Sequence, residues 1–226
     1  VAQTASQGGP LIDYGTRFIP EIAAKGMVSG PEKLASEAGL SMLKQGGNAV
    51  DAAVATGFAL AVTLPRAGNL AGGGFMLVHL AKTDEQVFID YREMAPASAS
   101  RDMFLNEDGT VNKQMAYNSP SAAGIPGTVA GMIHALENYG TLDLKTVIQP
   151  AIELAEQGFN VPAALHLNLR AATKRLARNE EANRIYLAGT GTAPAMGSLF
   201  KQPDLAATLQ RIRDKGTDGF YKGKTA

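Results

Sequence analysis

Gly68-Asn69-Leu70-Ala71-Gly72-Gly73-Gly74-Phe75-Met76 is followed a few residues later by Val87-Phe88-Ile89-Asp90-Tyr91-Arg92-Glu93-Met94-Ala95-Pro96, and these two segments decide the fold. Residues 75–80 and 86–91 are apolar runs of strand length separated by a polar segment, which predicts a β-hairpin. Both runs are apolar on both faces, so we expect the hairpin to be covered above and below. This pattern favours a layered sandwich with helices outside, and it places Arg92 at the end of a buried strand.

The composition of the chain indicates a globular protein. Its 226 residues are 45% hydrophobic, which is enough to build one domain over residues 1–226. The 21 basic and 21 acidic residues cancel, so no broad field attracts nucleic acid or an anionic membrane. The chain has no cysteine, which excludes disulfides, thiolate metal sites and a cysteine nucleophile.

Neither the start of the chain nor its longest apolar run predicts a membrane segment. Residues 1–10 lack an initiator methionine, a basic region and an apolar region, and we interpret them as a processed or trimmed start. The apolar run from Ala49 to Leu64 is rich in alanine and interrupted by Asp51, which is typical of a core helix.

Capping residues and glycines divide the rest of the chain into helices. Ser29 and Glu32 fit a capping box and predict a helix that ends at residues 46–47, and Asn48 predicts a second helix that ends before Pro65. A turn is expected at residues 106–109 and a loop at 188–194. Further helices are predicted over residues 127–139, 144–157, 162–178 and 204–215.

The glycines at positions 72–74 do not indicate a nucleotide site. No G-x-x-x-x-G-K-[ST] pattern is present, and these glycines open a strand, whereas a phosphate loop opens a helix. We interpret them as positions where the backbone has a positive φ or is closely approached by another segment, which is compatible with lining a cleft.

Arg92 is the strongest candidate binding residue. A permanent charge at the end of a buried strand needs an anion beside it. A neighbouring carboxylate, Asp90 or Glu93, would give a structural ion pair, whereas a substrate carboxylate would suit the two-pronged guanidinium. The residues alone leave both readings open.

No catalytic, metal or cofactor residue stands out elsewhere. His79, His134 and His166 lack metal-ligand spacing and are interpreted as structural. No G-x-S-x-G pattern is present. Three acidic residues on a helix flank are interpreted as solvated: Asp143, Glu153 and Glu156. A binding group without a nucleophile suggests half of a site.

Several long motifs, in order along nearly the whole chain, resemble the large subunit of bacterial γ-glutamyltranspeptidases. The residues that carry the resemblance are 26–29 (GMVS), 45–55 (QGGNAVDAAVA), 68–76 (GNLAGGGFM), 90–96 (DYREMAP), 127–131 (GTVAG) and 220–223 (FYKG).

This resemblance implies an N-terminal-nucleophile hydrolase, an α+β fold with a four-layer αββα sandwich completed by a second, small subunit cut from the same precursor. The N-terminal threonine of that subunit would attack the γ-glutamyl amide of glutathione or glutamine, and water, an amino acid or a peptide would take up the acyl group. In the family, the arginine of the D-[YF]-R-E-x-A-P motif binds the α-carboxylate, and here that arginine is Arg92. No catalytic residue is expected in this chain.

The chain departs from the family pattern at two places. Ala71 stands where the family often has a further glycine, a mild change. Family large subunits run well past the Phe-Tyr-x-Gly motif, so we expect a chain that ends at Ala226 to be the N-terminal portion of the large subunit.

Two alternatives to a γ-glutamyltranspeptidase stay open at this point. One is a cephalosporin acylase that removes a glutaryl side chain and uses the same arginine, and the other is an inactive binding or scaffold homologue. Bacterial members are typically periplasmic or secreted, and the resemblance implies the same here.

Overall fold

The computed structural model describes residues 21–226, so the expected processed start at residues 1–10 lies outside the described part. The fold is mixed α+β, and none of the helices between residues 21 and 226 has the length and apolar content needed to cross a bilayer. The elements are α1 Lys33–Lys44, α2 Ala49–Thr63, β1 Phe75–Leu80, β2 Glu85–Asp90, α3 Lys113–Asn118, the 3-10 turn Pro120–Ala122, α4 Thr128–Tyr139, α5 Leu144–Gln157, β3 Phe159–Asn160, α6 Ala163–Leu176, α7 Glu180–Tyr186, β4 Leu199–Phe200, α8 Pro203–Lys215 and α9 Asp218–Tyr221.

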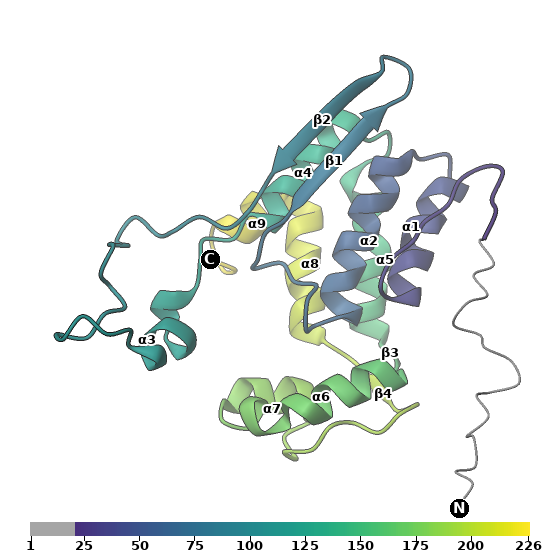
Figure 1. Ribbon diagram of the computed structural model, residues 1–226. Coiled ribbons are helices and arrows are strands. Elements are labelled where there is room, and N and C mark those ends of the chain that lie inside the picture. The colour runs from purple at the N-terminus through teal and green to yellow at the C-terminus, as the bar shows by residue number, and fades with distance from the viewer. Residues whose placement is uncertain (1–20) are drawn as a thin grey trace, which may run out of the picture.

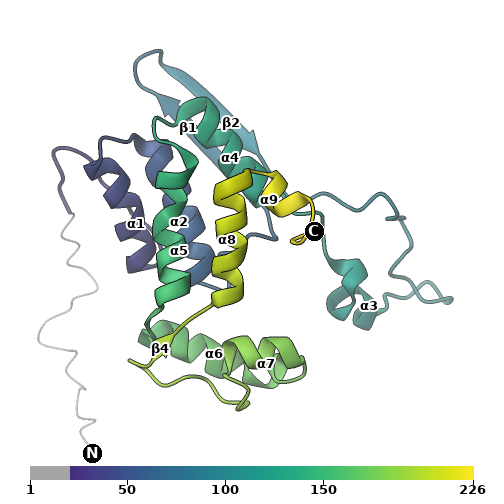
Figure 2. The same ribbon diagram turned by 180° about the vertical axis from the view of Figure 1, so that it is seen from behind.

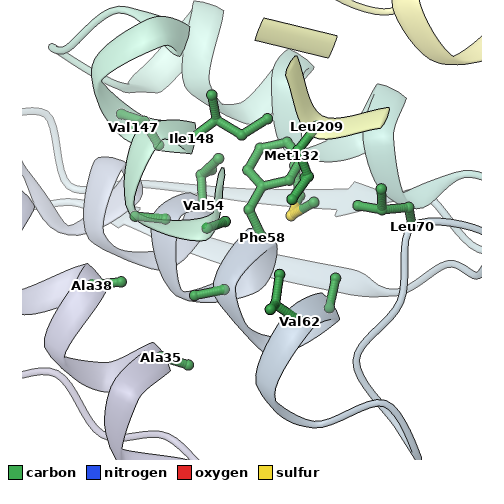
Figure 3. Close-up of a cluster of buried hydrophobic side chains, with 14 of the residues drawn as sticks. Ala35, Ala38, Val54, Phe58, Val62, Leu70, Met132, Val147, Ile148 and Leu209 are labelled. Atoms are coloured by element: carbon green, nitrogen blue, oxygen red, sulfur yellow. The ribbon is translucent and has the colours of Figure 1, made fainter. Parts of the chain in front are cut away.

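Helix α2 lies at the centre of the helical layer, between α1, α5 and α4 (Figures 1 and 2). Its small side chains allow close packing on several sides, and Val54, Phe58 and Val62 are fully buried against neighbouring helices (Figure 3). Burial of a side chain such as Phe58 stabilises the fold by about 1.5–3 kcal/mol. The alanine-rich run is therefore a core helix, as the sequence predicts.

The N-terminus of α2 is held by a network of hydrogen bonds around a buried carboxylate. Asn48 caps the helix, and its backbone amide donates to Asp51 at 2.6 Å, which completes a capping box. The Asp51 carboxylate also accepts the backbone amides of Thr141 at 2.9 Å and Leu142 at 3.0 Å, and the Thr141 hydroxyl at 2.7 Å. Asp51 thus ties α2 to the turn between α4 and α5.

The predicted hairpin is formed by β1 and β2, which pair antiparallel with Phe75 opposite Asp90 and Leu77 opposite Phe88. The inner face packs on the core through Val78 and Ile89, with α4 behind the hairpin (Figure 1). The opposite face is open, because Phe75, Leu77 and Phe88 are 52%, 69% and 63% exposed. The expectation of cover on both faces is therefore wrong for residues 21–226.

Most predicted helices are present, with differences at their ends and three additions. Helix α1 begins at Lys33, and its cap is Glu32, whose carboxylate accepts the Ala35 amide at 2.9 Å; Ser29, the expected cap, lies outside the helix. The turn at residues 106–109 is present, with Gly109 at φ 81°. The short helices α3, α7 and α9 were not expected from the sequence.

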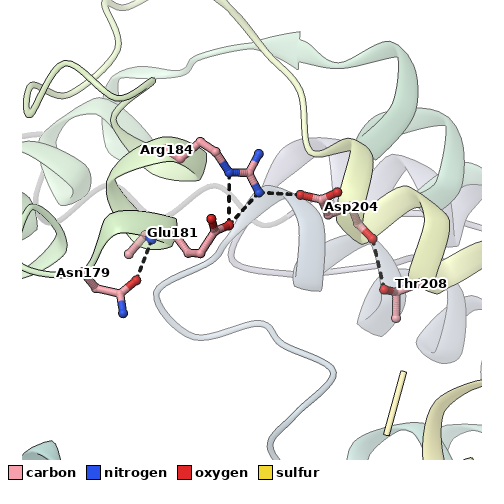
Figure 4. A network of polar contacts seen from close by, with 6 residues as sticks. Asn179, Glu181, Arg184, Asp204 and Thr208 are labelled. Atoms are coloured by element: carbon pink, nitrogen blue, oxygen red, sulfur yellow. Dashed lines mark hydrogen bonds and ion pairs between the residues drawn. The ribbon is translucent and has the colours of Figure 1, made fainter. Parts of the chain in front are cut away.

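Helices α6 and α7 lie at the end of the molecule opposite the hairpin (Figures 1 and 2). Arg184 of α7 donates to Glu181 and, at 2.7 Å, to Asp204 at the start of α8 (Figure 4). Hydrogen bonds to these carboxylates raise the pKa of Arg184. Because all three side chains are more than half exposed, this network orients α7 against α8 and contributes little to stability.

Candidate functional site

The segment that follows β2 is fixed between two backbone ladders. Tyr91 and Gly74 exchange hydrogen bonds at 3.1 and 3.3 Å, and Met94 and Ile125 exchange a second pair at 2.8 and 3.2 Å. Arg92 and Glu93 lie between these pairs. The backbone of this segment is therefore held at both ends, which defines where the Arg92 side chain starts.

Glycines surround this segment because neighbouring backbones come too close for a side chain. A Cβ added at Gly73 would lie 2.6 Å from the Glu93 amide nitrogen, and one at Gly124 would lie 2.8 Å from the Glu93 Cβ. A Cβ at Gly127 would collide with the Tyr91 carbonyl. The close approach predicted for the glycine cluster is confirmed, whereas the alternative, a positive φ at residues 72–74, is not observed.

Tyr91 anchors the segment from the inner side of the hairpin. Its half-buried ring lies against Gly74 and Gly131, and a Cβ at Gly131 would overlap the ring. Burial raises the pKa of the Tyr91 hydroxyl. Because alternate residues of a strand face opposite sides, anchoring Tyr91 inside directs Arg92 to the outer face.

The C-terminal helix α9 supports the same region from a distance in sequence. The Tyr221 hydroxyl donates to the Pro126 carbonyl at 2.9 Å and accepts the Ala130 amide at 3.3 Å. In addition, the Gly72 carbonyl accepts the Gly127 amide at 2.7 Å. The start of α4 is thus fixed to the glycine cluster on one side and to Tyr221 on the other.

Arg92 is exposed, which corrects the expectation of a buried strand end. Among residues 21–226, no carboxylate lies within ion-pair distance of its guanidinium, so the structural ion pair with Asp90 or Glu93 is not formed. Asp90 instead accepts the backbone amide of Arg92 at 3.0 Å. The guanidinium carbon lies 6.0 Å from the centre of the Phe75 ring.

Arg92 lies beside an open hollow of about 740 Å³ between β2, α4 and α9. Asp90, Pro126, Ala130 and Tyr221 also line it. The hollow is large enough for an amino-acid-sized group, and it places the free donors of a guanidinium at its edge. The arrangement can therefore bind an anionic group, and a planar carboxylate fits it best.

Of the other residues considered from the sequence, His134 lines the same hollow as Arg92, and the rest have local roles or lie elsewhere. The ring nitrogen of His166 lies 2.8 Å from the Pro194 carbonyl oxygen, and His134 contacts Asn138 on the same helix. His79 lies 4.0 Å from Asp84 at the hairpin turn. Within residues 21–226, His and acidic side chains form no group of three that could hold a metal ion. Asp143 is more than a solvated residue, because it caps α5 through the Thr146 amide at 2.7 Å.

Sequence reasoning missed the supporting roles of Tyr91 and Tyr221. A signal for Tyr91 was present, because Gly127 and Gly131 lie four residues apart and mark one face of a helix that something must approach closely. Tyr221 belongs to the Phe-Tyr-x-Gly motif, but that motif does not indicate its partner Pro126, which lies 95 residues away.

Comparison with known proteins shows which family this chain resembles. The model of the γ-glutamyltranspeptidase family matches residues 35–226. The glutathione hydrolase proenzyme of Escherichia coli K12 is 44% identical over 225 residues, which cover 98% of this chain and 39% of the relative. The chain thus spans about two fifths of that relative's length.

Solved structures agree with the sequence comparison. The γ-glutamyltranspeptidase of Helicobacter pylori matches with a TM-score of 0.88 at 42% identity, over 92% of this chain and 59% of that one. The cephalosporin acylase of Bacillus halodurans is more distant, with a TM-score of 0.73 and 26% identity over 95% of this chain and 41% of that one. On the family match and the identity to the E. coli relative, this chain belongs to the γ-glutamyltranspeptidase family.

Proposed function

We propose that this chain is part of the large subunit of a γ-glutamyltranspeptidase. The enzyme would cleave the γ-glutamyl amide of glutathione, glutamine or a related compound and transfer the acyl group to water, an amino acid or a peptide. The nucleophile would be the N-terminal threonine of a small subunit made from the same precursor, forming an acyl-enzyme ester. Family membership and the motifs along the chain support this proposal.

The single observation that carries the role of this chain is that Arg92 has a fixed backbone and an exposed guanidinium, unpaired within residues 21–226. Its backbone is fixed on both sides, whereas its guanidinium is exposed and has no carboxylate partner among the described residues. We propose that Arg92 binds the α-carboxylate of the γ-glutamyl group through two parallel hydrogen bonds. Holding the α-carboxylate fixes the position of the γ-carbonyl, so that binding energy orients the reacting carbon.

The open face of the hairpin supports the proposed architecture. Phe75, Leu77 and Phe88 form an apolar surface that water would otherwise cover. We propose that a sheet containing strands of the small subunit packs on this face and completes a four-layer αββα sandwich. The Arg92 guanidinium lies over Phe75 of this face and at the edge of the hollow, so the small subunit would bring its threonine close to the proposed carboxylate site. By resemblance to bacterial members, the enzyme would be periplasmic or secreted.

A glutaryl acylase is the second candidate, and the likeness to the Bacillus halodurans cephalosporin acylase favours it. A glutaryl group carries a carboxylate at the same chain length but has no α-amine. Comparison of kcat/KM for a γ-glutamyl anilide and a glutaryl anilide separates the two activities. We expect the γ-glutamyl anilide to be the better substrate, and a failure to cleave either one would favour an inactive scaffold.

The test of the Arg92 assignment uses the full-length precursor. Loss of two charge-assisted hydrogen bonds, at about 1.5 kcal/mol each, predicts that Arg92→Ala raises KM for a γ-glutamyl anilide by about 100-fold. Arg92→Lys should recover part of this loss, because an ammonium cannot form the two-pronged contact. Self-cleavage should proceed normally, since the guanidinium supports no other described residue by an ion pair.

Arg170→Ala is the matched control, because Arg170 is an exposed arginine on α6, at the opposite end of the molecule from the hairpin (Figure 1). We expect its KM to equal that of the unmodified enzyme. An unchanged KM for Arg92→Ala would refute the carboxylate-binding role.

A further inference from the structure

We propose that Phe75 is a positioning residue for Arg92, and that its ring holds the guanidinium in the orientation that binds the substrate carboxylate. This inference rests on the proposed function. It assigns a positioning role to an aromatic residue that is not itself proposed to bind the substrate. Phe75 is the first residue of β1, directly after the glycine cluster.

Phe75 lies beside the arginine and is itself held by a neighbouring ring. Phe75 is the cross-strand partner of Asp90, whose carboxylate accepts the Arg92 amide at 3.0 Å. The Arg92 guanidinium carbon lies 6.0 Å from the Phe75 ring centre, within the range of a cation–π interaction. The Phe75 ring stacks on Phe88, with centroids 5.8 Å apart and planes 17° apart, which restricts its own movement.

An aromatic ring has an advantage over a carboxylate as a support for this arginine. A neighbouring carboxylate would occupy the N–H donors that a substrate needs. The face of an aromatic ring attracts the cation through its quadrupole and uses none of these donors. Phe75 can therefore hold the guanidinium in place while its donors stay available to a carboxylate.

A support of this kind reduces the conformational entropy that the arginine side chain loses when the substrate binds. A free arginine side chain samples many rotamers, and part of this conformational freedom is lost when the substrate fixes it. A side chain that is already oriented loses less on binding. The expected effect of Phe75 is therefore on substrate affinity and not on the chemical step.

The position of Phe75 argues against a purely structural role within this chain. The side chain is 52% exposed and lies on the outer face of the hairpin. Leu77 lies on the same face and is 69% exposed. Its cross-strand partner is Phe88, so it does not neighbour Arg92, and it serves as a comparison.

The experiment is a double-mutant cycle in the full-length precursor, with KM and kcat measured on a γ-glutamyl anilide. A single weak cation–π contact predicts that Phe75→Leu raises KM about two- to fivefold with kcat unchanged. In the Arg92→Ala background, Phe75→Leu should have no further effect, because the group it positions is missing. The Phe75→Tyr variant keeps the aromatic ring, so its KM should equal that of the unmodified enzyme.

Leu77→Ala is the control, and its effect on KM should be the same with and without Arg92. If Phe75→Leu blocks folding or self-cleavage, phenylalanines with one to three ring fluorines at position 75 replace it. These keep the shape of the ring and weaken its quadrupole, so KM should rise with each fluorine.

The outcomes separate this proposal from the proposed function. If Arg92→Ala leaves KM unchanged, the carboxylate-binding role fails, and this inference fails with it. If Arg92→Ala raises KM but Phe75→Leu leaves it unchanged, or raises it equally in both backgrounds, the positioning role alone is refuted. A KM that does not respond to fluorination also refutes it.

Discussion

Replacing Asp51 by asparagine should destabilise the protein through one defined set of hydrogen bonds. Asp51 is fully buried, and one of its oxygens accepts the Asn48 amide at 2.6 Å and the Thr141 hydroxyl at 2.7 Å. The other accepts the amides of Thr141 and Leu142. In the Asp51→Asn variant, one oxygen becomes an NH2 group that faces the Asn48 amide, and two donors then point at each other.

The expected loss follows from counting these bonds. The Thr141 hydroxyl can turn and accept from the new NH2 group, but the Asn48 amide has no acceptor, and the remaining bonds no longer reach a charged oxygen. Loss of one hydrogen bond to a charged group, with a donor left unpaired, costs about 2–4 kcal/mol. Urea unfolding of the full-length precursor at pH 7 measures this difference.

The dependence on pH tests whether the carboxylate is responsible. Burial raises the pKa of Asp51, but hydrogen bonds from Leu142, Asn48 and Thr141 together lower it below its ordinary value. Because the folded-state pKa is lower than the unfolded one, the stabilisation is complete above about pH 4 and is lost as the pH falls through the folded-state pKa. The difference between native protein and variant should be constant from pH 7 to pH 5 and shrink below pH 4.

Asp143→Asn is the matched control, because Asp143 caps α5 at the surface and asparagine caps a helix equally well. We expect this variant to be as stable as the native protein at pH 7. A loss below about 1 kcal/mol for Asp51→Asn, or the same loss in both variants, would refute the assignment.

Two further predictions concern backbone geometry. Gly131→Ala should raise KM for a γ-glutamyl anilide and cost about 1–3 kcal/mol of stability, because its methyl group overlaps the Tyr91 ring and displaces the segment that carries Arg92; an unchanged KM would contradict the support role of this glycine. Ala188→Gly should stabilise the protein by about 0.5–1 kcal/mol in urea unfolding, because Ala188 has a φ of 50°. The reverse change at its neighbour, Gly189→Ala, should destabilise, since Gly189 has a φ of 72° and open space around it; a stabilising effect there would refute the strain argument.

The elements predicted best from the sequence are those whose ends are set by local chemistry. The expected bounds of α5 agree with the structure, because Gly158 ends the helix at a φ of 86°. Helix α2 begins after the predicted cap Asn48. The start of α1 was misplaced because Ser29 and Glu32 are competing caps, and local sequence does not rank them.

The candidate site was predicted only in part. The motif and the strand end single out Arg92 as the candidate. Its exposure was not predicted, because an apolar pattern shows that a face must be covered but does not show which part of the protein covers it. Residues 21–226 leave the outer face of the hairpin open. The support from Tyr221 depends on a contact across 95 residues, which no local pattern encodes.

The open hairpin is also a surface at which aggregation can start. Within residues 21–226, the β1–β2 sheet has no third strand, so both outer edges carry unpaired backbone groups beside exposed aromatic side chains. Such edges pair readily with strands of other molecules and start aggregation. When two chains are joined in one precursor, each is kept near the other at millimolar effective concentration. If the proposed small subunit covers this face, synthesis with it as a single polypeptide would allow that cover to reach the hairpin before another copy does.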